Sequence, residues 1–184
     1  MEALMRCGTI VALFLAAMLA PISAMGVLAA PSEPVLNERA EPGGPVDIDA
    51  IDDATLAGVM ANYVVNIYLS PQAMTPEEIE QLYAPRVAYF GEASKSREAI
   101  IRDKRAYYTR WPLRSYAIVP DTMEITRAGL DGKRIEVTFQ FTFDVRSRRR
   151  ISQGRATARL AFDFATPGGQ IVAEEGDVIS RGRN

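Results

Sequence analysis

The chain has 184 residues, of which 48% are hydrophobic and 24% charged, and its formal net charge is −2. These values fit one globular domain with appendages and give no reason to expect binding to nucleic acid. The chain has no histidine, and its only cysteine is Cys7. Ser-His-Asp triads, Cys-His dyads, Cys/His zinc sites and intramolecular disulfides are therefore excluded. We expect no metal and no cofactor, and any acid–base chemistry would use carboxylates, tyrosines or lysines.

The N-terminal segment, residues 1–30, has the pattern of a secretory signal peptide. Arg6 precedes an apolar run over residues 10–20 that ends at Pro21, and small residues follow before Pro31. The alternative is an uncleaved membrane anchor, because the uncharged stretch of residues 7–30 is long enough to span a bilayer. We favour cleavage, since the unbroken apolar core is short. In both cases we expect an exported domain, either periplasmic or anchored to the outer side of the inner membrane.

Residues 31–50 are rich in proline and glycine and contain few apolar side chains. This composition predicts an extended, mobile linker, followed by one folded domain over residues 51–184.

The folded domain begins with a predicted amphipathic helix. Asp52 or Asp53 is placed to cap its N-terminus, and the helix is expected to run to Leu69. One continuous apolar face is formed by Leu56, Val59, Met60, Tyr63, Val64 and Ile67.

Two further helices are predicted from start and stop signals. Thr75, followed by proline and then by glutamate three residues after the threonine, opens a short helix that Pro85 ends. Residues 86–91 then form a short strand that ends at a glycine. The third helix starts near Ser96 and ends at Pro112.

The clearest pattern in the chain is strict alternation of apolar and polar residues over 133–146, continued over 151–164. Such alternation predicts two long strands, each with one buried face. Further strands are expected over residues 115–120, 123–128 and 170–180. Helices followed by a long antiparallel meander indicate an α+β domain, with about three N-terminal helices packed on one face of a curved antiparallel or mixed sheet.

This order of elements resembles the nuclear transport factor 2-like superfamily, the cone-shaped fold shared with SnoaL-like proteins and ketosteroid isomerase. The resemblance covers about residues 51–181. It includes the segment Leu-Tyr-Ala-Pro-Arg-Val-Ala-Tyr-Phe-Gly over residues 82–91 and the start of the third helix over residues 94–101. The end of that helix, Arg110-Trp111-Pro112, resembles the same place in secreted or periplasmic bacterial members. It implies a ligand pocket between the concave sheet face and the helices, and members include isomerases, cyclases, dehydratases and proteins that only bind or assemble.

Glu174 is the carboxylate that we consider first for this pocket. Val172, Glu174 and Val178 share one face of the last strand, while Ile171 and Ala173 share the other, so parity alone leaves the inward face open. If Glu174 faces inward, burial among apolar residues would make it a useful general base, with Tyr89 or Tyr107 as hydrogen-bond donor. The alternative, which we favour, is an ion pair with Arg110 or Arg114 at the edge of the cone.

Aromatic side chains form a second candidate group, because they offer a flat or apolar ligand a large contact area with a polar tip. Core packing is the alternative, and for residues at helical spacing we favour it. The expected pocket lining comprises Tyr63, Tyr89, Tyr107, Tyr108, Trp111, Phe139, Phe141, Phe143 and Glu174.

Two surface features complete the predictions. Four arginines (Arg146, Arg148, Arg149 and Arg150), with Arg155 nearby, are placed to meet phosphate, anionic lipid headgroups or an acidic partner, although we favour a solvated loop. The regular polar face of the long strand (Glu136, Thr138, Gln140 and Thr142) suggests a homodimer, because members of the superfamily often dimerise through the outer sheet face.

Three functions remain open after these observations. The first is a non-enzymatic exported domain that holds a small apolar ligand or a partner protein in the cell envelope, in contact with the membrane only through its N-terminal segment. The second is an isomerase, cyclase or dehydratase of the SnoaL or ketosteroid isomerase type, with a carboxylate base and a tyrosine donor. The third is a module that only assembles through its sheet.

Overall fold

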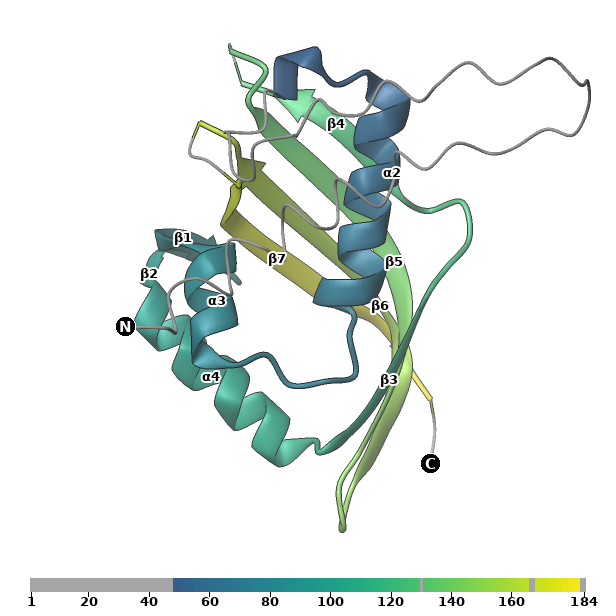
Figure 1. Cartoon of the computed structure of the whole chain (residues 1–184). Helices are drawn as coiled ribbons and strands as arrows, with labels where there is room; N and C mark the ends of the chain where they lie inside the picture. Colours follow the sequence, from purple (N-terminus) through teal and green to yellow (C-terminus); the bar gives the residue numbers. More distant parts are fainter. Residues whose placement is uncertain (1–47, 130, 166–167, 183–184) are drawn as a thin grey trace, which may run out of the picture. The chain divides into compact units, whose positions relative to one another are not determined.

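The structure is a computed structural model of the whole chain, and it describes residues 48–182 except residues 130, 166 and 167 (Figure 1). The predicted signal peptide or anchor, and nearly all of the predicted linker, lie outside this described part. No helix within it is long and apolar enough to cross a membrane. The folded region includes Ile48, three residues earlier than predicted, because this side chain is buried in the core.

Side-chain caps begin the three α-helices at the predicted positions. The Asp52 carboxylate accepts the Thr55 N–H at 2.8 Å, Thr75 and Glu78 form a capping box, and the Ser96 hydroxyl accepts a backbone N–H from the first turn of its helix. The helical segments are η2 (Ile48–Ala50), α2 (Asp53–Tyr63), η3 (Val64–Tyr68), α3 (Pro76–Leu82) and α4 (Arg97–Arg110).

The helix predicted to reach Leu69 changes its winding before it ends. η3 is a π-helical turn, in which the Leu69 N–H donates to the Val64 carbonyl at 2.9 Å. This wider turn accommodates one extra residue and changes the direction of the side chains at its end, a feature often found at functional sites. It therefore determines the direction of Tyr68.

The sheet contains seven strands in the order β2-β1-β7-β6-β5-β3, and β4 also pairs with β5. Only the pairing of β1 with β7 is parallel. The strands are β1 (Tyr83–Tyr89), β2 (Glu92–Ser96), β3 (Leu113–Ile118), β4 (Glu124–Ala128), β5 (Arg134–Arg146), β6 (Ile151–Asp163) and β7 (Gln170–Arg181). The chain therefore has the predicted α+β architecture, with helices on one side of a curved, mixed and unclosed sheet (Figure 1).

The first two strands of the sheet differ from the prediction. β1 begins at Tyr83 rather than Arg86. Pro85 has no N–H to donate, but the pairing of β1 with β7 is irregular after Tyr83, so the strand can include this proline. β2 was not predicted at all, since its sequence, Glu-Ala-Ser-Lys-Ser, is short, polar and largely exposed.

The alternation in β5 does mark the inner face of the sheet. Ile135, Val137 and Phe139 are each 0% exposed, and they lie opposite Phe162, Leu160 and Ala158 of β6. Residues of α2, α3 and α4 join the same core cluster. Full burial of one such side chain stabilises the fold by about 1.5–3 kcal/mol, so the long strands are a principal source of stability.

A β-bulge decides which residues of β7 face this core. Ala173 pairs with Ala161, but the next pair is Ile171 with Phe162, which leaves Val172 without a partner residue. The extra residue reverses the alternation of β7. Ile171 and Glu174 therefore both face inward, although their positions differ in parity, and they are 0% and 2% exposed.

Candidate functional site

Glu174 lies in the interior, between the sheet and the helices. It pairs with Leu160 of β6 on one side and with Tyr89 of β1 on the other. It is the only charged or polar residue among the buried residues of the described part of the chain. Burying a carboxylate costs free energy unless hydrogen bonds or an opposite charge compensate it, so its partners define the site.

Three donors compensate the Glu174 carboxylate. The Tyr68 hydroxyl donates to Oε1 at 3.0 Å, and the Tyr83 hydroxyl donates to Oε2 at 2.5 Å. Lys104 Nζ lies 3.3 Å from Oε1 and therefore supplies a positive charge. We call these four residues the Glu174 cluster.

Lys104 also lies over two of the aromatic rings in the cluster. Its Nζ is 5.6 Å from the centroid of the Tyr68 ring and 5.1 Å from that of Tyr83. Such cation–π contacts stabilise an ammonium group that has lost part of its water. The lysine is thus held by a carboxylate and two aromatic faces together.

Each member of the Glu174 cluster comes from a different element of the fold. Tyr68 ends the π-helical turn η3, Tyr83 is the first residue of β1, and Lys104 is four residues after the buried Ile100 on α4. The i, i+4 spacing places Lys104 on the inner face of α4. Sequence reasoning missed all three, and this spacing is the signal that could have identified Lys104.

The tyrosines of the cluster are hydrogen-bond donors over the whole physiological pH range. Burial raises the pKa of Tyr68 and of Tyr83 well above the usual value, and the negative charge of Glu174 raises both further. Both effects disfavour the phenolate form. The two hydroxyls therefore keep the protons that they donate to Glu174.

Tyr63 lies close to the cluster but is not part of its hydrogen-bond network. Its ring packs edge-on against Phe162, with 5.1 Å between centroids, and its hydroxyl is buried without a hydrogen-bond partner among the described residues. Burial first and then the charge of Glu174 raise the pKa of Tyr63, so this hydroxyl also remains protonated. A buried donor without an acceptor is uncommon in folded proteins and calls for an explanation, such as a bound water or ligand.

The structure does not bring the predicted catalytic candidates together at Glu174. Glu174 is ion-paired with Lys104, not with Arg110 or Arg114. The Tyr107 hydroxyl forms a hydrogen bond with the Tyr116 hydroxyl at 2.7 Å, away from the carboxylate.

Tyr89 is buried close to Glu174 but packs mainly against other groups. Its ring contacts Phe90 at 4.7 Å between centroids and lies 4.9 Å from Lys95 Nζ. Burial, then the charge of Glu174, raise the pKa of Tyr89. Tyr68 and Tyr83, rather than Tyr89 and Tyr107, are therefore the donors to the carboxylate.

The remaining residues of the predicted lining do not form one group. Phe139 is fully buried and packs edge-on against Tyr68, with 5.8 Å between centroids, while Phe141 is partly buried beside it. Tyr108 stacks with the Arg114 guanidinium at 4.6 Å. Trp111 caps the C-terminus of α4 and is partly buried.

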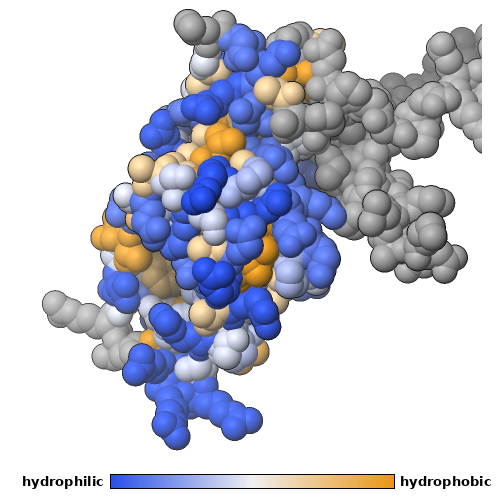
Figure 2. All heavy atoms as spheres, turned by 90° about the vertical axis from the view of Figure 1, so that its left-hand side faces the viewer, coloured by the Kyte–Doolittle hydropathy of each residue, from blue (hydrophilic) through white to orange (hydrophobic). Residues whose placement is uncertain are grey.

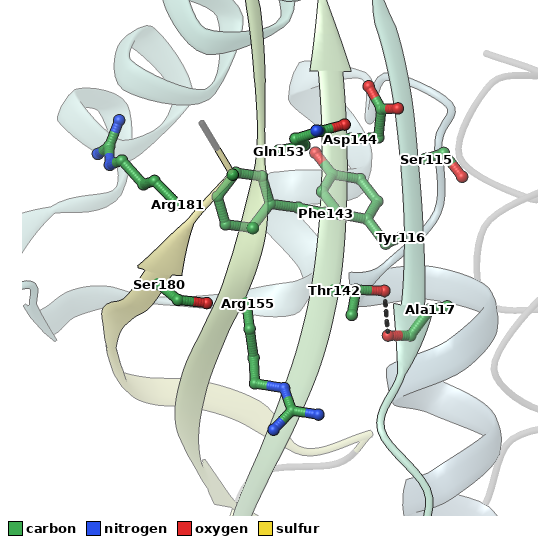
Figure 3. Close-up of a pocket in the computed structure, with 12 residues that line it drawn as sticks. Ser115, Tyr116, Ala117, Thr142, Phe143, Asp144, Gln153, Arg155, Ser180 and Arg181 are labelled. Carbon is green, nitrogen blue, oxygen red and sulfur yellow. Dashed lines mark hydrogen bonds between the residues drawn. The ribbon is translucent and has the colours of Figure 1, made fainter. Parts of the chain in front are cut away.

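Phe143 borders a separate hollow of about 520 Å³, where β3, β5, β6 and β7 run side by side (Figure 3). A row of outward-facing side chains crosses this hollow, since Thr142 pairs with both Ala117 and Arg155. Arg155 and Arg181 point away from each other in Figure 3, so their charges do not converge on one ligand.

No group of three or more acidic or cysteine side chains that could hold a metal ion occurs in the part of the chain that the structure describes. The Glu174 carboxylate itself has about four acceptor positions, and three donors already occupy most of them. The site therefore offers a neutralised carboxylate, three protonated phenols and an apolar wall. This combination is suited to holding one polar atom of an otherwise apolar molecule.

Comparison with known proteins identifies the fold of the chain. No protein family matches the sequence, and no curated protein matches it significantly. Solved structures do match, among them a nuclear transport factor 2-like superfamily protein from Salmonella enterica, with a TM-score of 0.55 and 14% identity over 69% of this chain and 94% of that one.

Two further solved structures match at similar levels. Aln2 from a Streptomyces species has a TM-score of 0.53 and 11% identity over 70% of this chain and 93% of its own. A Catenulispora acidiphila protein in complex with S-DNPA has a TM-score of 0.51 and 14% identity over 69% and 95% of the two chains. The chain therefore has the nuclear transport factor 2-like fold that its sequence resembles.

Proposed function

We propose that this domain binds a small, largely apolar molecule between its helices and the inner face of its sheet, without chemical conversion. The molecule carries an acceptor oxygen, such as a carbonyl, and the Tyr63 hydroxyl donates a hydrogen bond to it. The unpartnered, buried Tyr63 hydroxyl is the observation that carries this proposal. An acceptor from a ligand would remove the free-energy cost of leaving this donor unpaired.

The state of Glu174 favours binding over catalysis. A general base must be within hydrogen-bond reach of the proton that it removes. The Glu174 carboxylate instead accepts from Tyr68 and Tyr83 and pairs with Lys104. A substrate could reach it only after one of these donors moved, so the cluster is better suited to forming a fixed polar wall.

A solved structure with the same fold supports the proposal in general terms. The Catenulispora acidiphila protein was solved in complex with S-DNPA, and its fold matches most of the described domain. A scaffold of this kind is therefore able to hold a ligand. Shared fold alone does not transfer function, so the residues around Tyr63 carry the argument here.

An enzyme of the isomerase or dehydratase type is the second candidate, and the burial of Glu174 beside two tyrosine hydroxyls favours it. Acetophenone in D₂O separates the two functions. An enzyme with a working base would remove a methyl proton, form an enolate held by a tyrosine, and return a deuteron. Exchange above the buffer rate that Glu174→Gln abolishes would establish the enzyme, whereas the binding function predicts no such exchange.

We also propose that the domain works outside the cytoplasm. The basic start, short apolar core and small residues of the N-terminal segment support export, and the proline- and glycine-rich linker would separate the domain from the membrane.

Native mass spectrometry of the full chain, purified from its own compartment, tests the proposed function. We expect one small molecule per chain under native conditions and none after denaturation. Tyr63→Phe should lower the occupied fraction, while Tyr107→Phe, a matched change near the surface, should not. Wild-type protein without a small molecule, or equal occupancy in Tyr63→Phe, would contradict the proposal.

A further inference from the structure

The hairpin between β5 and β6 projects from the end of the molecule opposite β4, at the bottom of the view in Figure 1. Residues 147–150 form its turn. The Ser147 N–H donates to the Arg150 carbonyl at 2.8 Å, and the Ser147 hydroxyl accepts the Arg150 N–H at 3.2 Å. The turn is thus held in a defined shape, and hydrophilic side chains cover the lower end of the molecule in Figure 2.

Positive charge is concentrated at this turn. Residues 144–155 contain five arginines and one aspartate, a net charge of +4 in a chain whose total is −2. Asp144 is bonded to Arg146 at 2.8 and 2.6 Å, so it does not neutralise the turn itself. Arg148, Arg149 and Arg150 are exposed, and none of them forms an ion pair with another described residue.

Exposed apolar side chains lie at the base of the same hairpin. Leu113 of β3 pairs with Arg146, and Arg146 pairs with Ile151 of β6, so the three side chains form one row across the sheet. Leu113 is 66% exposed and Ile151 is 48% exposed. Arginines beside exposed aliphatic residues are typical of surfaces that bind to lipid headgroups and insert apolar side chains below them.

We propose that this hairpin, with Arg148, Arg149, Arg150, Ile151 and Leu113, docks on a bilayer of anionic phospholipid. The arginines contact the phosphates, and the two aliphatic side chains enter the boundary between headgroups and acyl chains. This docking surface is separate from the interior site at Tyr63, and the inference does not depend on the proposed function.

An acidic protein and nucleic acid are the other anionic surfaces that the arginines could meet. The turn contains no aromatic residue for base stacking, which disfavours nucleic acid. The exposed Leu113 and Ile151 have no role against a purely polar acidic surface. A lipid surface accounts for both the charge and the apolar pair.

The test is sedimentation of the full chain with vesicles of phosphatidylglycerol and phosphatidylcholine in equal parts, compared with vesicles of phosphatidylcholine alone. The N-terminal apolar segment contributes to both, so the measured quantity is the ratio of the two partition coefficients. Each arginine near an anionic surface is worth about fivefold in binding, and replacing Arg148, Arg149 and Arg150 with Gln should lower the ratio about a hundredfold.

A matched control removes the same charge elsewhere. Arg86, Arg102 and Arg134 are also exposed, and Arg134 lies at the opposite end of β5. Replacing these three with Gln should leave most of the preference for anionic vesicles. Circular dichroism and the thermal midpoint verify that both triple variants are folded.

A further variant separates the apolar contribution. High salt screens the attraction of the arginines but not the insertion of aliphatic side chains. Leu113→Ser with Ile151→Ser should therefore lower the binding that remains at high salt. Two results would overturn the proposal: no preference of the wild-type chain for anionic vesicles, or an equal loss of that preference in the control triple variant. If the wild-type chain shows no such preference, the arginines would instead be assigned to an acidic protein partner.

Discussion

The Lys104 ammonium lies 3.3 Å from the Glu174 carboxylate, and both side chains are shielded from solvent, at 13% and 3% exposed. This ion pair joins α4 to β7 inside the domain. The burial of two opposite charges is favourable only when they lie close together and hydrogen bonds satisfy their remaining donor and acceptor positions. Tyr68 and Tyr83 provide those hydrogen bonds.

Lys104→Met should lower the free energy of unfolding by about 3–5 kcal/mol, because it leaves the carboxylate buried without an opposite charge. Chemical denaturation measures the loss. The double variant Lys104→Met with Glu174→Leu should regain most of the lost stability, since it removes both charges. A double variant as unstable as Lys104→Met alone would show that the lysine acts through packing and not through the carboxylate.

Lys95 provides a control for this experiment. It pairs with Glu92 at 2.8 Å and Asp103 at 2.7 Å, but both carboxylates are exposed. Lys95→Met should therefore have a much smaller effect than Lys104→Met.

Tyr83→Phe should cost about 1.5–3 kcal/mol of stability, the range for a buried hydrogen bond to a charged group. Tyr68→Phe should act in the same direction. Tyr107→Phe is the comparison, because its hydroxyl bonds to Tyr116 at an exposed position. Equal effects of Tyr83→Phe and Tyr107→Phe in denaturation would mean that the hydroxyl of Tyr83 is not essential to the cluster.

The stability of the domain should fall as the pH rises above about 10. The pKa values of Tyr63, Tyr68 and Tyr83 are raised from their usual value of 10.0, mainly by burial. Above this pH the unfolded chain releases protons that the folded chain keeps, so the unfolded state binds fewer protons and stability decreases with pH. Each tyrosine contributes about 1.4 kcal/mol per pH unit.

Absorbance of phenolate and denaturation at several pH values together test this dependence. The buried tyrosines should ionise only as the protein unfolds, and Tyr83→Phe should make the decline with pH less steep. Phenolate formation by these residues in the folded protein near pH 10 would contradict the described burial.

The sequence predicted the framework of this fold because its signals are local. Capping residues such as Asp52 and Ser96 identify helix starts, and strict alternation identifies β5 and β6, since every second side chain must be apolar when one face is buried. The inner-face role of Phe139 followed from this alternation.

The candidate site was harder to predict because irregularities create it. The bulge at Val172 has no glycine or proline to mark it, yet it determines that Glu174 faces inward. The π-helical turn redirects Tyr68 in a similar way. Lys104 was not predicted because a charged residue on a helix is usually exposed. Its inward position is explained only by its ion pair with the buried Glu174.

Export of the chain stays a prediction and has a simple test. Residues 1–50 fused to alkaline phosphatase, which is active only after export, should give activity in a bacterial host. Replacing two leucines of the apolar core with Arg should abolish it, because the segment would no longer be apolar over its length. An inactive but full-length wild-type fusion would contradict export.

The most direct test of the ligand-binding account compares two probes of the same shape. Acetophenone has a carbonyl oxygen where α-methylstyrene has a methylene group, so only acetophenone can accept a hydrogen bond from Tyr63. Calorimetric titration should show wild-type protein binding acetophenone about five- to tenfold more tightly, the equivalent of about 1 kcal/mol for one hydrogen bond. Tyr63→Phe should bind both probes equally. Equal affinities in the wild-type protein, or a preference that survives in Tyr63→Phe, would contradict a ligand held by the Tyr63 hydroxyl.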